Sequence, residues 1–338
     1  MSTPVTPTVP ASSPTAYNAP ASRGLRGLTW AVLRLHRGAL LVAAGSVAAG
    51  AVALAWLRTV GPAAARASGP CGSSDTDLPP CEDFAGSAIS AYAGNMSLAA
   101  TLIAWLPFAV AVYAGGVLIG RELERGTAAL AWTQSVTPAR WLAAKLLLPA
   151  LLITAGTALL SLLYRWARNG GPSALADEWY YDDVFRALGP VSIAYALCGL
   201  AIGALAGLLL RRALPAAGLA LLTTGFLTVL GGRHREQLWP ATDRTTTGSA
   251  ADLTNGTWQL ANGVLSTSGQ RIAATPCWDE YEQALAQCQS REGITGSYAV
   301  FHPASHFWPL QLVETGIVLA LTAVLTVAAF AVLRRRHA

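Results

Sequence analysis

Six long apolar stretches constrain the fold of this 338-residue chain more than any other feature. They cover residues 39–57, 96–120, 142–164, 189–210, 213–232 and 308–333. An α-helix needs roughly 20 apolar residues to cross the hydrocarbon core of a bilayer, and each stretch comes close to that length or exceeds it. With 53% hydrophobic and only 12% charged residues, the composition supports a membrane protein over a pair of soluble domains. The sequence therefore predicts an all-α polytopic membrane protein with six transmembrane helices.

The charged residues predict how these helices are oriented. Arginines flank both termini and the 121–145 loop, whereas nearly all acidic residues fall in the loops expected on the other side. The positive-inside rule then places both termini and this loop in the cytoplasm, in a multi-pass protein of the cell membrane. Arg58, Arg165 and Arg168 oppose this orientation, because they lie on the outer side.

The cysteines were not used to set this orientation, and they agree with it. Four of the five lie in the predicted outer loops, where an oxidising compartment permits disulfides, and Cys198 lies in a span. The sequence separations favour the local pairs Cys71 with Cys81 and Cys277 with Cys288. Three connectivities remain open for four cysteines, and four unpaired residues are the alternative.

The chain divides into five segments. Residues 1–22 are predicted to be a disordered cytoplasmic tail, because they lack any periodicity. Residues 23–37 place leucines on one helical face and arginines on the other, which indicates an amphipathic interfacial helix; a frayed extension of the first span is the alternative. The first five spans occupy 38–232 and are followed by a small extracytoplasmic domain at 233–307, and the sixth span with a basic cytoplasmic end occupies 308–338.

The 233–307 segment reads as loops and short strands, with a helix closed by its own cysteines in CWDEYEQALAQC. His302 and His306 are four residues apart, a spacing that can bind a metal on one helical face. Pro303 and Trp308 favour an interfacial turn over that site, so no metal is predicted. Nearby acidic residues are expected to form a solvated face and not a catalytic pair: Asp279, Glu280 and Glu282.

Glu314 is the one acidic residue well inside a predicted span. A carboxylate in the membrane is costly and suggests a function, such as ion coupling or substrate contact. Two turns separate it from Trp308, so snorkelling toward the outer surface is slightly favoured over a functional role.

Residues 121–145, RELERGTAALAWTQSVTPARWLAAK, form a charged island between two apolar runs. Gly126 can end the preceding helix, because glycine adopts positive φ without strain. AALAWTQ predicts a short re-entrant helix, and Thr137 followed by Pro138 is typical of a helix start. The island is expected to present Trp132 and two carboxylates to a cytoplasmic partner, with an ordinary charged turn as the alternative.

Two parts of the island resemble the permease subunits of bacterial ABC-2 type exporters. These are Glu122-Leu123-Glu124-Arg125-Gly126-Thr127 and Thr137-Pro138-Ala139-Arg140-Trp141-Leu142-Ala143-Ala144-Lys145. The resemblance implies that the island is a coupling loop that docks on a separate ATP-binding subunit. The residues implied in that role are Glu122, Glu124, Arg125, Gly126 and Thr127. It also implies a homodimer or a pair with a sister permease, which exports a hydrophobic or amphipathic substrate.

The sequence excludes several activities. Lys145 is the only lysine and lacks the glycines of a phosphate-binding loop, so the chain is expected not to be an enzyme and to hold no cofactor; ATP and Mg would be bound by the partner. Basic residues are too scattered for a nucleic-acid site. The alternative function is a membrane-anchored sensor or ligand-binding protein that uses the extracytoplasmic domain. A lipid-modifying enzyme is less supported, because few polar residues cluster at one leaflet.

Overall fold

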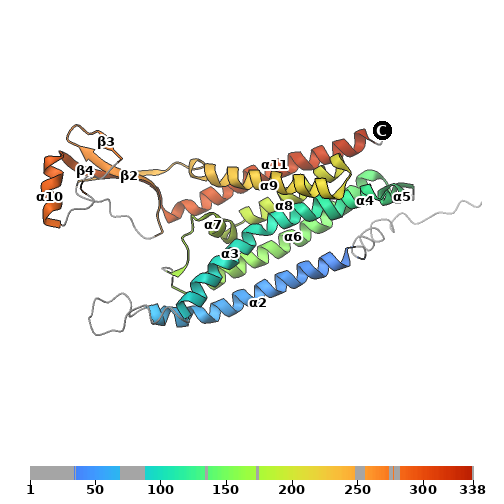
Figure 1. The fold of residues 1–338 in the computed structure, drawn as a ribbon, viewed down its shortest axis with the longest axis horizontal. Helices are drawn as coiled ribbons and strands as arrows, with labels where there is room; N and C mark the ends of the chain where they lie inside the picture. The colour runs from blue at the N-terminus through green and yellow to red at the C-terminus, as the bar shows by residue number, and fades with distance from the viewer. Residues whose placement is uncertain are drawn as a thin grey trace, which may run out of the picture.

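Six long helices form the body of the computed structural model, and each is long and apolar enough to cross a bilayer. They are α2 (Arg37–Ser68), α3 (Ala88–Val112), α6 (Pro138–Arg168), α8 (Val191–Leu210), α9 (Ala213–His234) and α11 (Phe307–Arg335). α3 is continued by the π-helix η3 (Tyr113–Gly120) and by α4 (Arg121–Glu124). Figure 1 shows the long helices lying side by side in a bundle. The six predicted spans are confirmed, with several helices extending a few residues beyond the apolar stretches.

The structure describes residues 34, 36–68, 88–133, 136–172, 175–247, 256–273, 277 and 282–336. Several predictions concern residues outside this set. The tail at 1–22, almost all of the interfacial helix at 23–37, and the Cys71 and Cys81 pair lie outside the described residues.

α8 is the central helix of the bundle and is the most buried of the six. It contacts α3, η3, α9 and α11. Gly199, Gly203 and Gly207 follow one another at four-residue spacing, and a Cβ on any of them would meet backbone or side-chain atoms of α3 and η3. Small residues at this spacing let two helix backbones approach closely, which is a common way to pack helices in membranes. The tight contact fixes α3 and η3 against α8.

The eight residues of η3 follow an i to i+5 hydrogen-bond pattern, which ends where the amide of Arg121 donates to the carbonyl of Gly116. Gly115 and Gly116 lie against the first turns of α9, where a Cβ would contact Ala216 and Ala217. π-helical turns are rare and are frequent at functional sites. Here the π-helix leads directly into the charged island.

The segment between α9 and α11 contains a β-sheet, so the all-α class is correct only for the membrane-spanning part, and the short strands expected in this segment are present. Its four antiparallel strands are arranged in the order β1-β4-β2-β3. The strands are β1 (Thr242–Thr246), β2 (Trp258–Ser266), β3 (Arg271–Ile272) and β4 (Ile294–His302). Short runs rich in Thr, Val and aromatic residues suit a half-buried pleated surface, which explains the strands expected in this segment. α10 (Glu282–Arg291) packs against β4, and a disulfide joins Cys277 to Cys288, which confirms that predicted pair.

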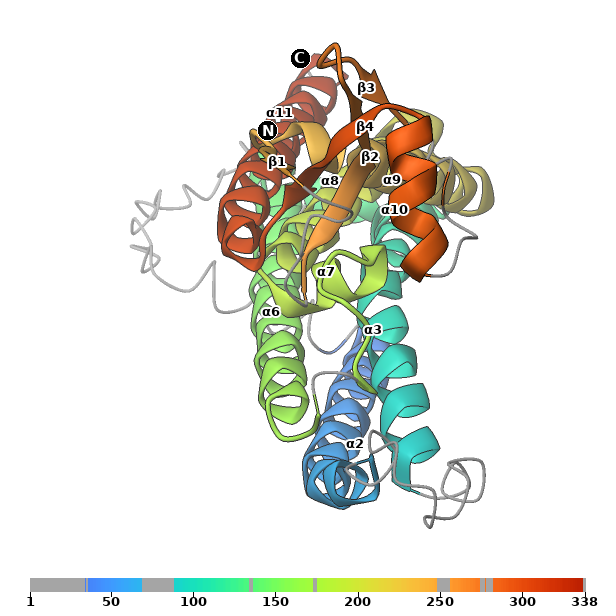
Figure 2. The same cartoon turned by 90° about the vertical axis from the view of Figure 1, so that its left-hand side faces the viewer.

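An aromatic cluster holds the sheet on the bundle. The ring of Trp179 meets Trp258 of β2 and Phe307 of α11 edge on, at centroid distances of 6.1 and 5.9 Å. Its indole Nε1 donates a hydrogen bond of 2.6 Å to the carbonyl of Gly256. Tyr180 stacks on Trp258 from the same loop, which precedes α7 (Asp182–Leu188). Figure 2 shows the sheet over the half of the bundle that contains α8, α9 and α11, with α2 at the bottom of the view, away from the sheet.

Candidate functional site

The charged island lies at the end of the bundle opposite the sheet, near the C-terminus (Figure 1). Gly126 has a φ of 72°, and its N–H donates to the carbonyl of Leu123 at 3.3 Å, so it ends α4 as predicted. A short helix, α5 (Thr127–Thr133), follows. The Thr137 hydroxyl accepts a hydrogen bond from the Arg140 amide at 3.4 Å and Pro138 is the first residue of α6, which confirms the predicted helix start. The island thus joins two spans through two tight helix ends.

Glu122 forms a buried ion pair with the only lysine of the chain. Its Oε1 lies 2.5 Å from Nζ of Lys145, whose side chain is 3% exposed, against 14% for Glu122. The same ammonium donates to the carbonyl of Leu118 at 3.1 Å and lies 5.4 Å from the ring centroid of Trp141. A charge in such a site must be paired and hydrogen-bonded to be tolerated. Lys145 therefore ties α6 both to α4 and to the backbone of the π-helix.

His36 extends this buried cluster to the start of α2. Its Nε2 lies 3.5 Å from Nζ of Lys145, and its Nδ1 lies 2.9 Å from the hydroxyl of Tyr113 in η3. An ammonium can only donate, so Nε2 accepts and Nδ1 carries the proton. Burial lowers the pKa of His36, and the positive charge of Lys145 lowers it further, against the opposite effect of Glu122. The imidazole is therefore neutral at pH 7.

Glu124 binds a third span. Its Oε2 accepts a hydrogen bond of 2.9 Å from the amide of Ala213, the first residue of α9. The first amides of a helix lack partners within the helix and carry partial positive charge, so a carboxylate there is stabilising. The sequence suggested that both carboxylates face a cytoplasmic partner. In the structure, Glu122 binds α6 and Glu124 binds the start of α9.

The remaining residues of the predicted coupling set are exposed: Arg125, Gly126 and Thr127. The Thr127 hydroxyl donates to the carbonyl of Glu122 at 3.2 Å, which braces the turn. Trp132 is half-buried, and its ring meets that of Trp141 edge on at 5.7 Å. The exposed part of the island is therefore the polar turn at 125–127 together with Glu124, while Trp132 packs largely against the protein itself.

Glu314, at the opposite end of the bundle, does not snorkel to the surface. It is 2% exposed, and its Oε2 lies 2.8 Å from Nε of Arg235. Its Oε1 accepts from the Tyr195 hydroxyl at 3.0 Å and from Nη2 of Arg235 at 3.3 Å. Arg235 also binds Asp182 at 2.6 Å and stacks over the ring of Phe185 at 3.9 Å. Burial with a paired guanidinium makes the intramembrane carboxylate tolerable without exposure to water.

His302 and His306 form the turn between β4 and α11. Their Nδ1 atoms lie 3.0 Å apart, and Nε2 of His302 lies 3.0 Å from the carbonyl of Glu236. Among the residues that the structure describes, no three His, Cys, Asp or Glu side chains converge on a common point. Of the acidic residues beside Cys277, Glu282 begins α10, and Asp279 and Glu280 fall outside the described part of the chain.

Sequence reasoning missed the partners of both clusters. His36 and Tyr113 carried no motif, and Arg235 was assigned to the soluble segment when in fact it is 2% exposed beside α9. One signal was available: an intramembrane carboxylate requires a cation, and Arg233 and Arg235 directly follow the preceding span in the sequence. The Lys145 pair had a similar signal, because a lone lysine at the start of a span needs a nearby carboxylate.

Comparison with known proteins gives one match. A family model described as "ABC-2 membrane transporter related" matches residues 42–233, which run from within α2 to the last turn of α9. No curated protein and no solved structure matches the chain. The matched region contains the whole charged island and ends before the sheet, which lies outside it together with α11.

Proposed function

Because the chain belongs to the ABC-2 membrane transporter related family, we propose that it is the transmembrane permease subunit of an ABC exporter. In this role it moves a hydrophobic or amphipathic substrate across the cell membrane, and a separate subunit binds ATP and Mg and hydrolyses the nucleotide. The match and the six span-capable helices establish a multi-pass membrane protein of this family. Substrate, direction and the ATP-binding partner are parts of the proposal.

The observation that carries the proposal is the double anchoring of α4. Glu122 is bound to Lys145 on α6, and Glu124 is bound to the first amide of α9. α4 itself is the end of the α3 and η3 span. One short helix, four residues long, thus continues one span and is bound to two others through charge-assisted bonds. A charged turn without a function would not need to hold three spans.

The geometry suggests how a displacement of the turn would be transmitted. An ATP-binding partner that docks on Arg125, Gly126 and Thr127 pushes α4 when it closes. Glu122 then displaces Lys145 with α6, and Glu124 displaces the start of α9. Shifts of packed helices against one another as rigid bodies are a common response to such a push. No covalent step takes place on this chain.

We also propose which end of the bundle faces which side of the membrane. The island and the C-terminus share one end of the bundle and would face the cytoplasm together with the N-terminus, while the sheet would be extracytoplasmic (Figure 1). The Cys277 to Cys288 disulfide lies at the sheet end and supports this placement, because disulfides persist in oxidising compartments. The functional unit would be a homodimer or a pair with a sister permease.

The test is to tag the chain, purify it from native membranes in mild detergent, and identify co-purifying proteins. We expect a stoichiometric ATP-binding subunit with a phosphate-binding loop. Glu124→Ala and Arg125→Ala should weaken that association or abolish transport-linked ATP hydrolysis. Arg334→Ala is the matched control, since it removes an exposed arginine of α11 at the same end of the bundle. If both island variants kept full association and transport, the coupling assignment would fail; a chain that purifies alone would favour the sensor function.

A further inference from the structure

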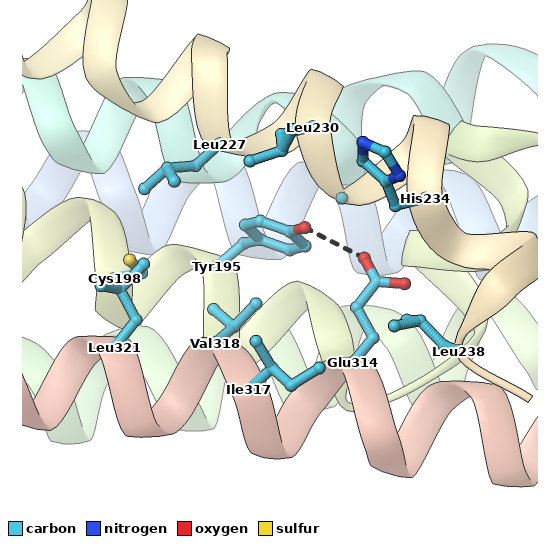
Figure 3. A pocket seen from close by; sticks show the side chains of 11 residues that line it. Tyr195, Cys198, Leu227, Leu230, His234, Leu238, Glu314, Ile317, Val318 and Leu321 are labelled. Carbon is cyan, nitrogen blue, oxygen red and sulfur yellow. Dashed lines mark hydrogen bonds between the residues drawn. The ribbon is translucent and has the colours of Figure 1, made fainter.

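A cavity of about 410 Å³ lies between α8, α9 and α11, at the level of Glu314. Figure 3 shows its walls, with Tyr195 and Cys198 from α8, Leu227 and Leu230 from α9, and Leu321 from α11. Ligand sites in proteins have volumes of roughly 300–1,000 Å³ and are mostly apolar with a few polar groups. The cavity therefore has the size of a site for one small ligand or one hydrocarbon tail.

The carboxylate in the cavity wall is already paired within the protein, so it does not need a positively charged occupant. Glu314 accepts from Tyr195 and Arg235 through one oxygen and from Arg235 through the other. Its charge is thus compensated from behind the cavity wall, where Arg235 also binds Asp182. The opposite end of the cavity, around Cys198, Leu227 and Leu321, is lined by apolar groups (Figure 3). Such a lining favours hydrocarbon over a charged or strongly hydrated group.

The position of the rim indicates where an occupant comes from. Leu230 of α9 and Ile317 of α11 line the cavity and are both exposed on the outside of the bundle. In a membrane, exposed leucine and isoleucine side chains of spanning helices face lipid tails and not water. In the single chain, the opening between α9 and α11 therefore leads into the bilayer. His234, at the end of α9 and also exposed, lies beside the Glu314 end, where a polar head group could meet its ring.

We propose that this cavity is a lateral entry site for a single-tailed amphiphile, which slides from the bilayer between α9 and α11. Its hydrocarbon tail occupies the space around Leu227 and Leu321, and its head group lies at His234. The volume suits one hydrocarbon tail. The inference rests on the proposed function and names the class of cargo that the permease would carry.

The helix that borders the cavity also begins at the charged island. α9 starts at Ala213, where Glu124 holds its first amide, and it lines the cavity from Leu227 to His234. A displacement of α9 produced at the island therefore reaches the opening between α9 and α11. This places the amphiphile beside a helix that contacts both regions.

The test uses the full-length chain in phospholipid nanodiscs and a photoactivatable diazirine derivative of hexadecanol as the probe. After illumination, labelled peptides are mapped by mass spectrometry as the probe concentration rises. We expect saturable labelling of residues 227–234 and 317–321 that unlabelled hexadecanol competes away. Leu230→Trp places an indole at the rim and should reduce the apparent affinity about tenfold, the effect of roughly 1.4 kcal/mol of lost interaction.

Leu222→Trp is the matched control, because Leu222 is exposed on the same helix and does not line the cavity. Retained labelling in this variant, with loss in Leu230→Trp, supports the site. Labelling that rises without saturation and is equal along all lipid-facing helices shows that only bulk lipid contacts the protein there, and it overturns the inference. The assay needs neither ATP nor a partner, so its failure is distinguishable from a failure of the association test of the proposed function.

Discussion

Among the residues that the structure describes, each end of the bundle has one buried Lys or Arg that joins several helices, but the two cations are supported differently. At the sheet end, Arg235 is shared by Glu314 and Asp182 and stacks on Phe185, and an aromatic cluster fixes the surrounding loops. At the island end, Lys145 has one carboxylate partner and a carbonyl from a π-helix. A guanidinium with two carboxylates and a planar stack is held in one geometry, whereas an ammonium on a flexible stem can exchange partners. The comparison indicates a rigid end and an end that can move.

The difference agrees with the division of roles in the proposed permease. An island that responds to a partner must have two arrangements of similar free energy, which a single ion pair beside a π-helix allows. The sheet end must keep its fold while a displacement of α9 alters the opening between α9 and α11. The following three predictions test this contrast, from the largest expected effect to the smallest.

Arg235→Leu should have the largest effect on stability. It leaves Glu314 buried without its cation, and removal of one partner of a buried pair typically costs about 3–5 kcal/mol. Thermal unfolding in detergent should show a clear fall in Tm, while Arg233→Leu, which removes an exposed neighbour, should leave Tm nearly unchanged. Adding Glu314→Gln to Arg235→Leu should recover part of the loss, because Asp182 is 54% exposed and remains hydrated. A Tm equal to that of the wild type would contradict a rigid, charge-dependent sheet end.

Lys145→Met should cost less stability than Arg235→Leu, about 1–3 kcal/mol, because Glu122 lies near the surface and can reach water. Its effect on coupling should be larger than its effect on Tm. In the reconstituted complex we expect ATP hydrolysis to continue while transport falls, since α6 no longer follows α4. Trp141 packs beside Lys145 but donates no bond to Glu122 among the described contacts, so Trp141→Phe serves as the control for lost packing. Transport that falls in step with protein yield would show that Lys145 only stabilises the fold.

The smallest expected effect is a pH dependence of stability at the island end, which His36 causes. The pKa of His36 in the folded protein lies below its ordinary value of about 6.5, so the unfolded chain binds the proton more readily. Its contribution to stability is therefore present above about pH 6.5 and is lost as the pH falls through the folded pKa. The groups facing His36 are Lys145, Glu122 and Tyr113. His36→Gln should lose less Tm than the wild type between pH 7.5 and pH 5.5, and an equal loss in both proteins would refute the assignment.

Local sequence patterns predicted much of the fold. Apolar length predicted the six spans, and the turn at Gly126 and the cap at Thr137 followed from residues adjacent in the chain. The Cys277 to Cys288 pair is likewise local, with a separation of 11 residues. These features depend on interactions within one turn or one loop, so the sequence alone determines them.

The charge clusters could not be predicted in the same way, because they depend on long-range packing. Arg235 and Glu314 are 79 residues apart, with the whole sheet between them, and His36 and Lys145 are separated by 109 residues. The π-helix also depends on tertiary contacts, since its glycines lie against α9. The bond from Ala213 to Glu124 connects segments 89 residues apart, and no motif marks it.

Lys145 gives this chain a built-in chemical reporter. Apart from the α-amino group of the chain, it offers the only amine, and that amine is almost completely shielded by Glu122, Leu118 and Trp141. An acylating reagent added to intact membranes should therefore leave the resting protein nearly unmodified at this position. A rise in acylation of one peptide would record the opening of the island in the proposed transport cycle, without any engineered label.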